Sequence, residues 1–178
     1  QQHLAARRPD ATAPAVPVAD HVVAATAPAT SAVTVRVYGE PSGQPVVVFA
    51  HGGGWVYGDL DMADGFCRRL CSRGGVVVCS VDYRLAPEHP FPTAVDDTWD
   101  AMCWLAAEAG RLGLQPGKLA VAGDSAGGTL AAVAAIQARD AGLPLALQML
   151  FYPGTSSHGD TPSHSRFASG LVLEREHI

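Results

Sequence analysis

The sequence has no long hydrophobic run, and no stretch approaches the ~18 consecutive apolar residues that a membrane-spanning helix requires. Charge is scarce as well, since charged residues make up only 16% of the 178 positions and acidic residues outnumber basic ones by 17 to 12. The net charge of −5 provides no basic stripe for nucleic acid and no polybasic patch for a membrane surface. The opening stretch QQHLAARRPD lacks the apolar region of a signal peptide. These absences favour a cytoplasmic protein with no nucleic-acid partner.

The cysteines also lack a pattern of known chemistry. There are four, Cys67, Cys71, Cys79 and Cys103, and no two form a CxxC pair. This spacing argues against a structural zinc site and against a thioredoxin-type redox pair. We expect reduced, mostly buried thiols and no bound metal.

The hydrophobic pattern alternates between short β-branched runs and longer helical ones. It predicts strands over 33–38, 46–50, 76–81, 119–123 and 147–152, and helices over 62–73, 93–113 and 125–142. The order of these elements predicts an α/β fold with a doubly wound, mostly parallel sheet. The turn-rich connection GEPSGQP predicts that the first two strands form a hairpin or meander. Residues 1–32 are expected to be an extended segment rather than a domain.

The helix boundaries carry their own signals. Gly74 and Gly75 are expected to end the first helix, because glycine readily adopts the left-handed conformation of a C-cap. Thr93 followed by Asp96 is close to a capping box and predicts the start of the second helix. In that helix Trp99 and Trp104 fall near helical spacing, which favours a packing role for both.

Ser125 lies in the stretch AVAGDSAGGTL, between a predicted strand and a predicted helix. The surrounding Gly123-Asp124-Ser125-Ala126-Gly127 fits the G-x-S-x-G pattern of a nucleophile elbow. Glycines suit so tight a turn because side chains there would meet neighbouring backbone. The helix that follows would direct its free N–H groups toward a developing oxyanion. The alternative is a glycine-rich turn without chemistry.

A second glycine cluster, His51-Gly52-Gly53-Gly54, follows the predicted strand over 46–50. Three glycines at a strand end can turn backbone N–H groups into open space, where acyl transfer needs oxyanion donors. His51 could be read as a catalytic base, but its place at the head of the loop favours a ring held by the backbone. The two glycine motifs together are far more specific than either alone.

A third marker, DYRLAPEHPFP at 82–92, is dense in charge and proline. We interpret it as a rigid structural loop in which Asp82, Arg84 and Glu88 are candidate ion-pair members. His89, between Glu88 and Pro90, is for the same reason a poor candidate for a general base.

In this order and spacing, HGGGW, DYRLAPEHPFP and GDSAGG resemble the hormone-sensitive-lipase-like branch of the α/β-hydrolases, the bacterial family IV esterases. The resemblance runs from about Val33 to the C-terminus. It implies hydrolysis of carboxylic esters with short or medium acyl chains, without a cofactor. It also implies that Ser125 is the nucleophile and that the oxyanion hole comes from the backbone N–H groups of Gly53, Gly54 and Ala126. The residues implied near the substrate pocket are Trp55, Tyr57, Asp124 and Tyr152.

The other two members of a Ser-acid-His triad are missing from the pattern. The resemblance implies an acid in a DPL-type segment and a histidine near the C-terminus, and neither segment follows Ser125. His158 and His164, with Asp160, lie in a polar segment that suits neither an improvised triad nor a metal pair, and His177 is next to last.

We therefore expect residues 33–178 to be a partial catalytic domain whose sheet stops before its last strands, and residues 1–32 to be the remnant of an N-terminal cap. The chain opens on Gln1 rather than Met, which indicates upstream residues. On this expectation the 178 residues alone are inactive, and their exposed sheet edge makes them unstable or prone to aggregate.

Two alternatives stay open. One is a non-catalytic, receptor-like relative that binds a small molecule, and the other is an amide or formamide hydrolase that uses the same groups. The resemblance also implies that dimers of the whole protein can form through its last strand.

Overall fold

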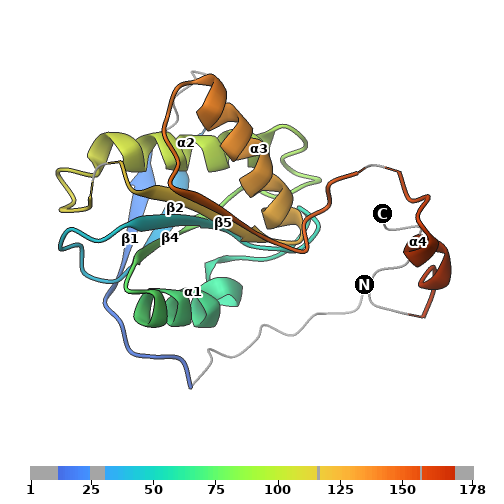
Figure 1. Ribbon diagram of the computed structural model, residues 1–178, viewed down its shortest axis with the longest axis horizontal. Helices are drawn as coiled ribbons and strands as arrows, with labels where there is room; N and C mark the ends of the chain where they lie inside the picture. The colour runs from blue at the N-terminus through green and yellow to red at the C-terminus, as the bar shows by residue number, and fades with distance from the viewer. Residues whose placement is uncertain (1–11, 25–30, 116, 157, 171–178) are drawn as a thin grey trace.

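The computed structural model describes residues 12–24, 31–115, 117–156 and 158–170, and these ranges form one six-stranded sheet with flanking helices (Figure 1). The strands are β1 (Val18–Val23), β2 (Val33–Tyr38), β3 (Val46–Ala50), β4 (Val77–Asp82), β5 (Leu119–Asp124) and β6 (Leu147–Phe151). Their spatial order is β1-β2-β4-β3-β5-β6. β4, β3, β5 and β6 run parallel to one another, and the two antiparallel pairs are β1 with β2 and β2 with β4. The predicted mostly parallel sheet is confirmed.

Helices cover both faces of this sheet, as a doubly wound fold requires. They are α1 (Leu60–Gly74), α2 (Thr93–Glu108), α3 (Ala126–Asp140) and the short α4 (Pro162–Arg166). Figure 1 shows α2 and α3 on one face of the sheet and α1 on the other. The helix α4 lies away from the sheet, at the end of the described chain.

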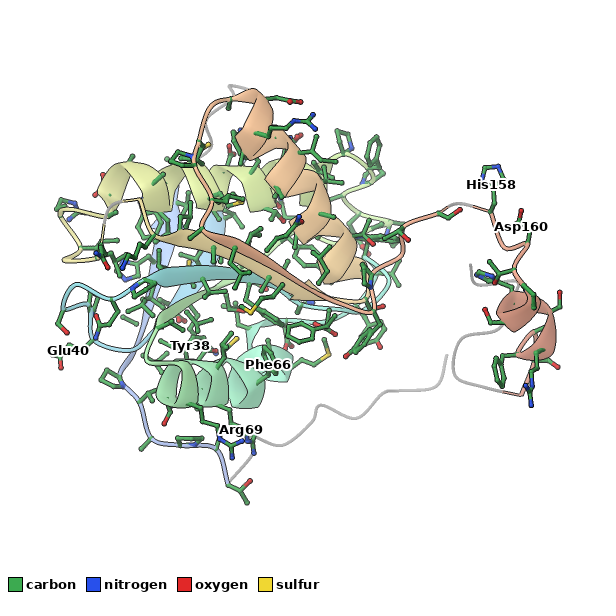
Figure 2. The ribbon with its side chains drawn as sticks, in the orientation of Figure 1. Tyr38, Glu40, Phe66, Arg69, His158 and Asp160 are labelled. Carbon is green, nitrogen blue, oxygen red and sulfur yellow. The ribbon has the colours of Figure 1, made fainter. Side chains whose placement is uncertain are left out.

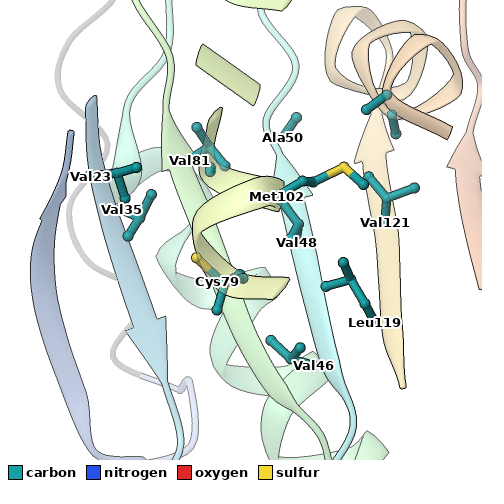
Figure 3. Close-up of a cluster of buried hydrophobic side chains, with 14 of the residues drawn as sticks. Val23, Val35, Val46, Val48, Ala50, Cys79, Val81, Met102, Leu119 and Val121 are labelled. Atoms are coloured by element: carbon teal, nitrogen blue, oxygen red, sulfur yellow. The ribbon is translucent and has the colours of Figure 1, made fainter. Parts of the chain in front are cut away.

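The hydrophobic core has two parts, one on each face of the sheet, because the side chains of a central strand alternate between two buried faces. In β3, Val46 and Val48 join the cluster beneath α2 and α3, whereas Val47 and Phe49 join the cluster beneath α1. Figure 3 shows the first cluster, where Met102 of α2 lies over the strands. All five residues of β3 are buried, which explains why this strand reads as an unbroken apolar run.

The predicted hairpin between 33–38 and 46–50 is wrong. β2 pairs with β1 and with β4, both antiparallel, and β3 lies one strand further into the sheet, between β4 and β5. The connection GEPSGQP is turn-rich, but it carries the chain past the position of β4. Strand order depends on contacts between distant segments, which a local turn signal does not report.

The N-terminal segment contains a strand that the pattern did not predict. β1 pairs antiparallel with β2 in the register Val18↔Tyr38 to Val23↔Val33. It is an edge strand in which only Val23 is buried, so its sequence lacks a clear hydrophobic alternation. Residues 1–11 and 25–30, which the expected extended segment includes, lie outside the described residues.

The predicted end of α1 is confirmed, whereas the capping box predicted for α2 is not. Gly75 ends α1 in the left-handed conformation, with its N–H bonded to the carbonyl of Cys71, as expected. The capping box at Thr93 is wrong, because Pro92 occupies the N-cap and no side chain caps the helix. α2 also ends at Glu108 rather than at 113, since turns containing Gly110 and Gly113 follow it. Part of the polar segment after β6 forms α4, a helix that the pattern did not predict.

The four cysteines are free thiols, three of them buried and Cys103 half-buried. Burial raises the pKa of Cys67 to about 12 and raises the pKa of each of the other three thiols. The tryptophans of α2 pack against the core, and the Trp104 ring lies 5.6 Å from that of His21. Within the described ranges, no cluster of three or more His, Cys, Asp or Glu side chains could hold a metal, and no helix could cross a membrane.

β6 forms the exposed end of the described sheet, and we expect the 178-residue chain to self-associate there. Leu147 is 53% exposed and Phe151 37% exposed, so an apolar strand edge is open to pairing. A Leu147→Lys substitution should weaken association about tenfold, because a charged edge opposes strand pairing. Sedimentation velocity over a range of concentrations measures the effect. Ile136→Lys, at an equally exposed position on α3, should change little, and equal effects of the two variants would contradict edge pairing.

Candidate active site

Ser125 occupies a strained turn between β5 and α3. Its backbone has φ 52° and ψ −120°, a region that non-glycine residues rarely adopt and that costs on the order of 1–3 kcal/mol. The Ser125 N–H donates to the carbonyl of Phe151 at 2.9 Å, and the Thr129 N–H donates to the Ser125 carbonyl at 3.1 Å. The end of β6 and the first turn of α3 thus hold this conformation. The arrangement matches the strand-turn-helix context predicted for a nucleophile elbow.

The glycines around Ser125 are required by close backbone approach. A Cβ added to Gly127 would overlap the carbonyl oxygens of Ala50 and His51, and one added to Gly123 would overlap the Gly127 carbonyl. The first turn of α3 therefore lies directly against the end of β3. This contact brings the serine turn next to the loop that follows β3.

That loop, residues 51–58, is a tight turn held by its own backbone. The N–H groups of Val56 and Tyr57 both donate to the Gly53 carbonyl at 3.1 Å. Gly53 has φ 127°, and a Cβ there would overlap the Tyr57 carbonyl. Trp55 is a non-glycine residue at φ 62°. Positive φ values on both glycine and non-glycine residues give the loop a shape that an ordinary chain would not keep without support.

The backbone N–H groups of Gly53, Gly54 and Ala126 donate to no acceptor within the described part of the chain. Gly53 lines the cavity beside Ser125, whereas Gly54 does not. These three N–H groups are the ones predicted for the oxyanion hole. The Gly52 N–H is different, because it donates to Oδ1 of Asp124 at 2.8 Å. Asp124 thus ties the loop to the residue before Ser125, and its contact removes Gly52 from the set of available donors.

A cavity of about 660 Å³ opens beside Ser125. Three of the four residues predicted near the pocket line it, namely Tyr57, Asp124 and Tyr152, whereas Trp55 is 41% exposed and does not line it. The apolar part of the wall was not predicted from the sequence and consists of Phe49, Met62, Ala63, Phe66 and Phe151. Rings in this wall touch, with centroids 4.9 Å apart for Phe49 and Phe66 and 5.7 Å apart for Phe66 and Phe151. Phe151 lies opposite Asp124, a predicted pocket residue, in the register of β5 and β6, so this strand pairing could have indicated it.

His51 is the only histidine in the described ranges that lines this cavity, and its ring is held by the backbone. It is 1% exposed, and its Nδ1 lies 2.7 Å from the Gly52 carbonyl. Desolvation lowers the pKa of His51 below its usual 6.5, so the ring is neutral near pH 7. Its Nε2 makes no hydrogen bond within the described residues. This geometry agrees with a structural role rather than with a base for Ser125.

The polar segment after β6 does not bring a base to Ser125. Figure 2 shows His158 and Asp160 on a stretch that leads away from the sheet and its helices. His164 lies on α4, where its Nδ1 is 2.5 Å from the hydroxyl of Thr161. His177 lies outside the described residues. Among the described residues, Ser125 and Gly53 line one cavity, whose only histidine is the backbone-held His51.

Comparison with known proteins places this chain among hydrolases. The sequence model of a family described as alpha/beta hydrolase fold matches residues 47–178. Carboxylesterase NlhH of Mycobacterium tuberculosis is 47% identical over 150 residues, which are 82% of this chain and 47% of that protein. An ethyl acetate hydrolase of Pseudomonas putida is 43% identical over 150 residues, 80% of this chain and 47% of that protein.

A solved esterase structure is also similar to this chain. A hyperthermophilic esterase from Pyrobaculum calidifontis superimposes with a TM-score of 0.82 at 43% identity, covering 90% of this chain and 53% of that one. The chain spans about half the length of the curated relatives it matches.

Proposed function

Because the chain belongs to the hormone-sensitive-lipase-like branch of the α/β-hydrolase family, we propose that it is the nucleophile-bearing part of a carboxylic ester hydrolase. We use "the whole protein" for this chain joined to the additional length that its relatives have. The single observation that carries the proposal is the strained turn at Ser125, which opens on a cavity shared with the glycine loop. Strain of this kind is maintained where a side chain must be presented for chemistry.

The proposed reaction has two steps. A base takes the proton of the Ser125 hydroxyl while its Oγ attacks the ester carbonyl, and the tetrahedral oxyanion accepts hydrogen bonds from the N–H groups of Gly53, Gly54 and Ala126. The alcohol leaves with a proton and an acyl-serine remains. Water then attacks the acyl group, releasing the carboxylic acid and restoring the serine. The base and its carboxylate partner come from outside the described residues, and no cofactor takes part.

The cavity supports a substrate of modest size. Its wall of Phe49, Met62, Phe66 and Phe151 favours an apolar acyl or alcohol group, and about 660 Å³ is within the usual range for small-molecule sites. The relative from Pseudomonas putida is named for a short ester, ethyl acetate. We therefore propose short- to medium-chain esters as substrates. Four free thiols support a cytoplasmic location, which with homodimerisation of the whole protein remains part of the proposal.

Trapping the acyl-enzyme tests this function directly. The whole protein is mixed with p-nitrophenyl acetate, quenched in acid within the first turnovers, digested, and analysed by mass spectrometry. We expect an acetyl group on the peptide that contains Ser125, accompanied by a burst of p-nitrophenol. Turnover with the acetyl group on another residue would contradict the assignment of Ser125, and binding without turnover would favour the receptor-like alternative.

A further inference from the structure

The segment that follows β4 has no part in the reaction proposed above, yet it contacts the glycine loop. Tyr83 is 2% exposed, and its hydroxyl donates to the His51 carbonyl at 2.7 Å. The Tyr83 ring stacks on the His51 imidazole, with centroids 4.3 Å apart and planes inclined by 17°. Burial raises the pKa of Tyr83, so its hydroxyl stays protonated and can donate throughout the neutral range.

The same segment also holds the other end of the glycine run. The Ala86 N–H donates to the Trp55 carbonyl at 2.9 Å. Tyr83 and Ala86 thus bind the two residues that flank the three glycines, His51 before them and Trp55 after them. Glycine has little conformational preference of its own, so the direction of the N–H groups between these points depends on how the flanking residues are fixed.

An ion pair fixes this segment to the body of the protein. Arg84 donates from Nη2 to Oδ1 of Asp97 at 2.7 Å, and from its backbone N–H to Oδ2 at 2.9 Å. Asp97 lies on α2 and is fully buried, and the Arg84 guanidinium compensates the charge of its carboxylate. This confirms Arg84 as an ion-pair member, whereas Asp82 and Glu88 form no ion pair within the described ranges. α2 packs on the core, and the neighbouring Arg84 ties Tyr83 to it, so the position of the Tyr83 side chain is fixed relative to the core.

We propose that Tyr83 is a positioning residue for the oxyanion hole: by holding the His51 carbonyl, its hydroxyl orients the N–H groups of Gly53 and Gly54. This inference rests on the proposed ester hydrolysis. Donors must lie about 2.7–3.1 Å from the oxyanion, and misplacement by ~1 Å can lower a rate about 100-fold. Loss of one tether loosens the loop without removing a donor, so a smaller effect is expected.

The test is Tyr83→Phe in the whole protein, which keeps the ring on His51 and removes only the hydroxyl. We expect kcat for p-nitrophenyl butyrate to fall about tenfold while KM changes less than about twofold, because the lost support matters chiefly in the transition state. The affinity for a trifluoromethyl ketone, which forms an oxyanion adduct with serine, should fall in parallel with kcat/KM. Unchanged kcat and unchanged inhibitor affinity would overturn the inference.

Tyr38→Phe is the matched control. Tyr38 is fully buried on β2, and its hydroxyl makes no hydrogen bond within the described residues, so its removal should leave kcat unchanged. Hydrogen exchange supplies a measurement that does not depend on activity. Amides of residues 51–58 should exchange about tenfold faster in Tyr83→Phe while those of β3 and β5 stay protected. Unaltered exchange in the loop would also overturn the inference. Absence of Ser125-dependent turnover in the wild type would instead contradict the proposed function.

Discussion

Ser125→Ala is expected to lower kcat of the whole protein toward short-chain p-nitrophenyl esters by about 10⁵-fold, since removal of a triad serine costs on the order of 10⁶ in kcat. The substitution removes only the hydroxyl, and the turn is held by backbone hydrogen bonds to Phe151 and Thr129 that alanine keeps. KM should change little, because the cavity wall is untouched. Residual catalysis by the oxyanion donors sets the lower limit of the rate.

The control for this prediction is Ser72→Ala, at an exposed position on α1, which should keep the wild-type rate. Equal rates for wild type and Ser125→Ala would remove Ser125 from the mechanism. The 178-residue chain assayed alone should show the same rate with and without the Ser125→Ala substitution, because no described histidine is placed to accept the proton. Ser125-dependent turnover by the chain alone would show that a base lies within it.

The features that sequence could predict are those set by neighbouring residues. Gly123 and Gly127 flank Ser125 in a pattern that only a tight strand-to-helix turn requires, and the structure has that turn. The glycine loop after β3 was predicted for the same reason, since a run of glycines directly after a buried strand indicates a backbone turn that side chains would obstruct.

The features that sequence missed depend on residues far apart in the chain. Phe66 reaches the cavity only because of how α1 packs on the sheet, and nothing in its helical spacing reports that orientation. The contact between Tyr83 and His51 joins residues 32 positions apart, so the 82–92 segment read as a structural loop with no stated target. The wrong hairpin has the same origin, because β2 pairs with β4, which follows both β3 and α1 in the chain.

Gly127→Ala is expected to destabilise the whole protein by more than about 3 kcal/mol, at or beyond the upper end of ordinary overpacking costs. The added Cβ would overlap the carbonyl oxygens of Ala50 and His51, which belong to the backbone and cannot rotate away as a side chain would. Relief requires α3 to move off the end of β3, and the buried residues of α3 that pack on the core, such as Leu130 and Ala131, would lose contacts. Urea unfolding followed by circular dichroism measures the change.

Gly110→Ala is the matched comparison, because Gly110 is exposed, follows α2, and has no atom within 4 Å of an added Cβ. Its stability should equal that of the wild type or exceed it by up to about 1 kcal/mol, since alanine reduces the entropy of the unfolded chain. If Gly127→Ala were as stable as Gly110→Ala, the close approach of α3 to β3 would be wrong. The same approach brings Ser125 and the Ala126 N–H beside the glycine loop, so this comparison tests whether packing between a helix and a strand assembles the candidate site.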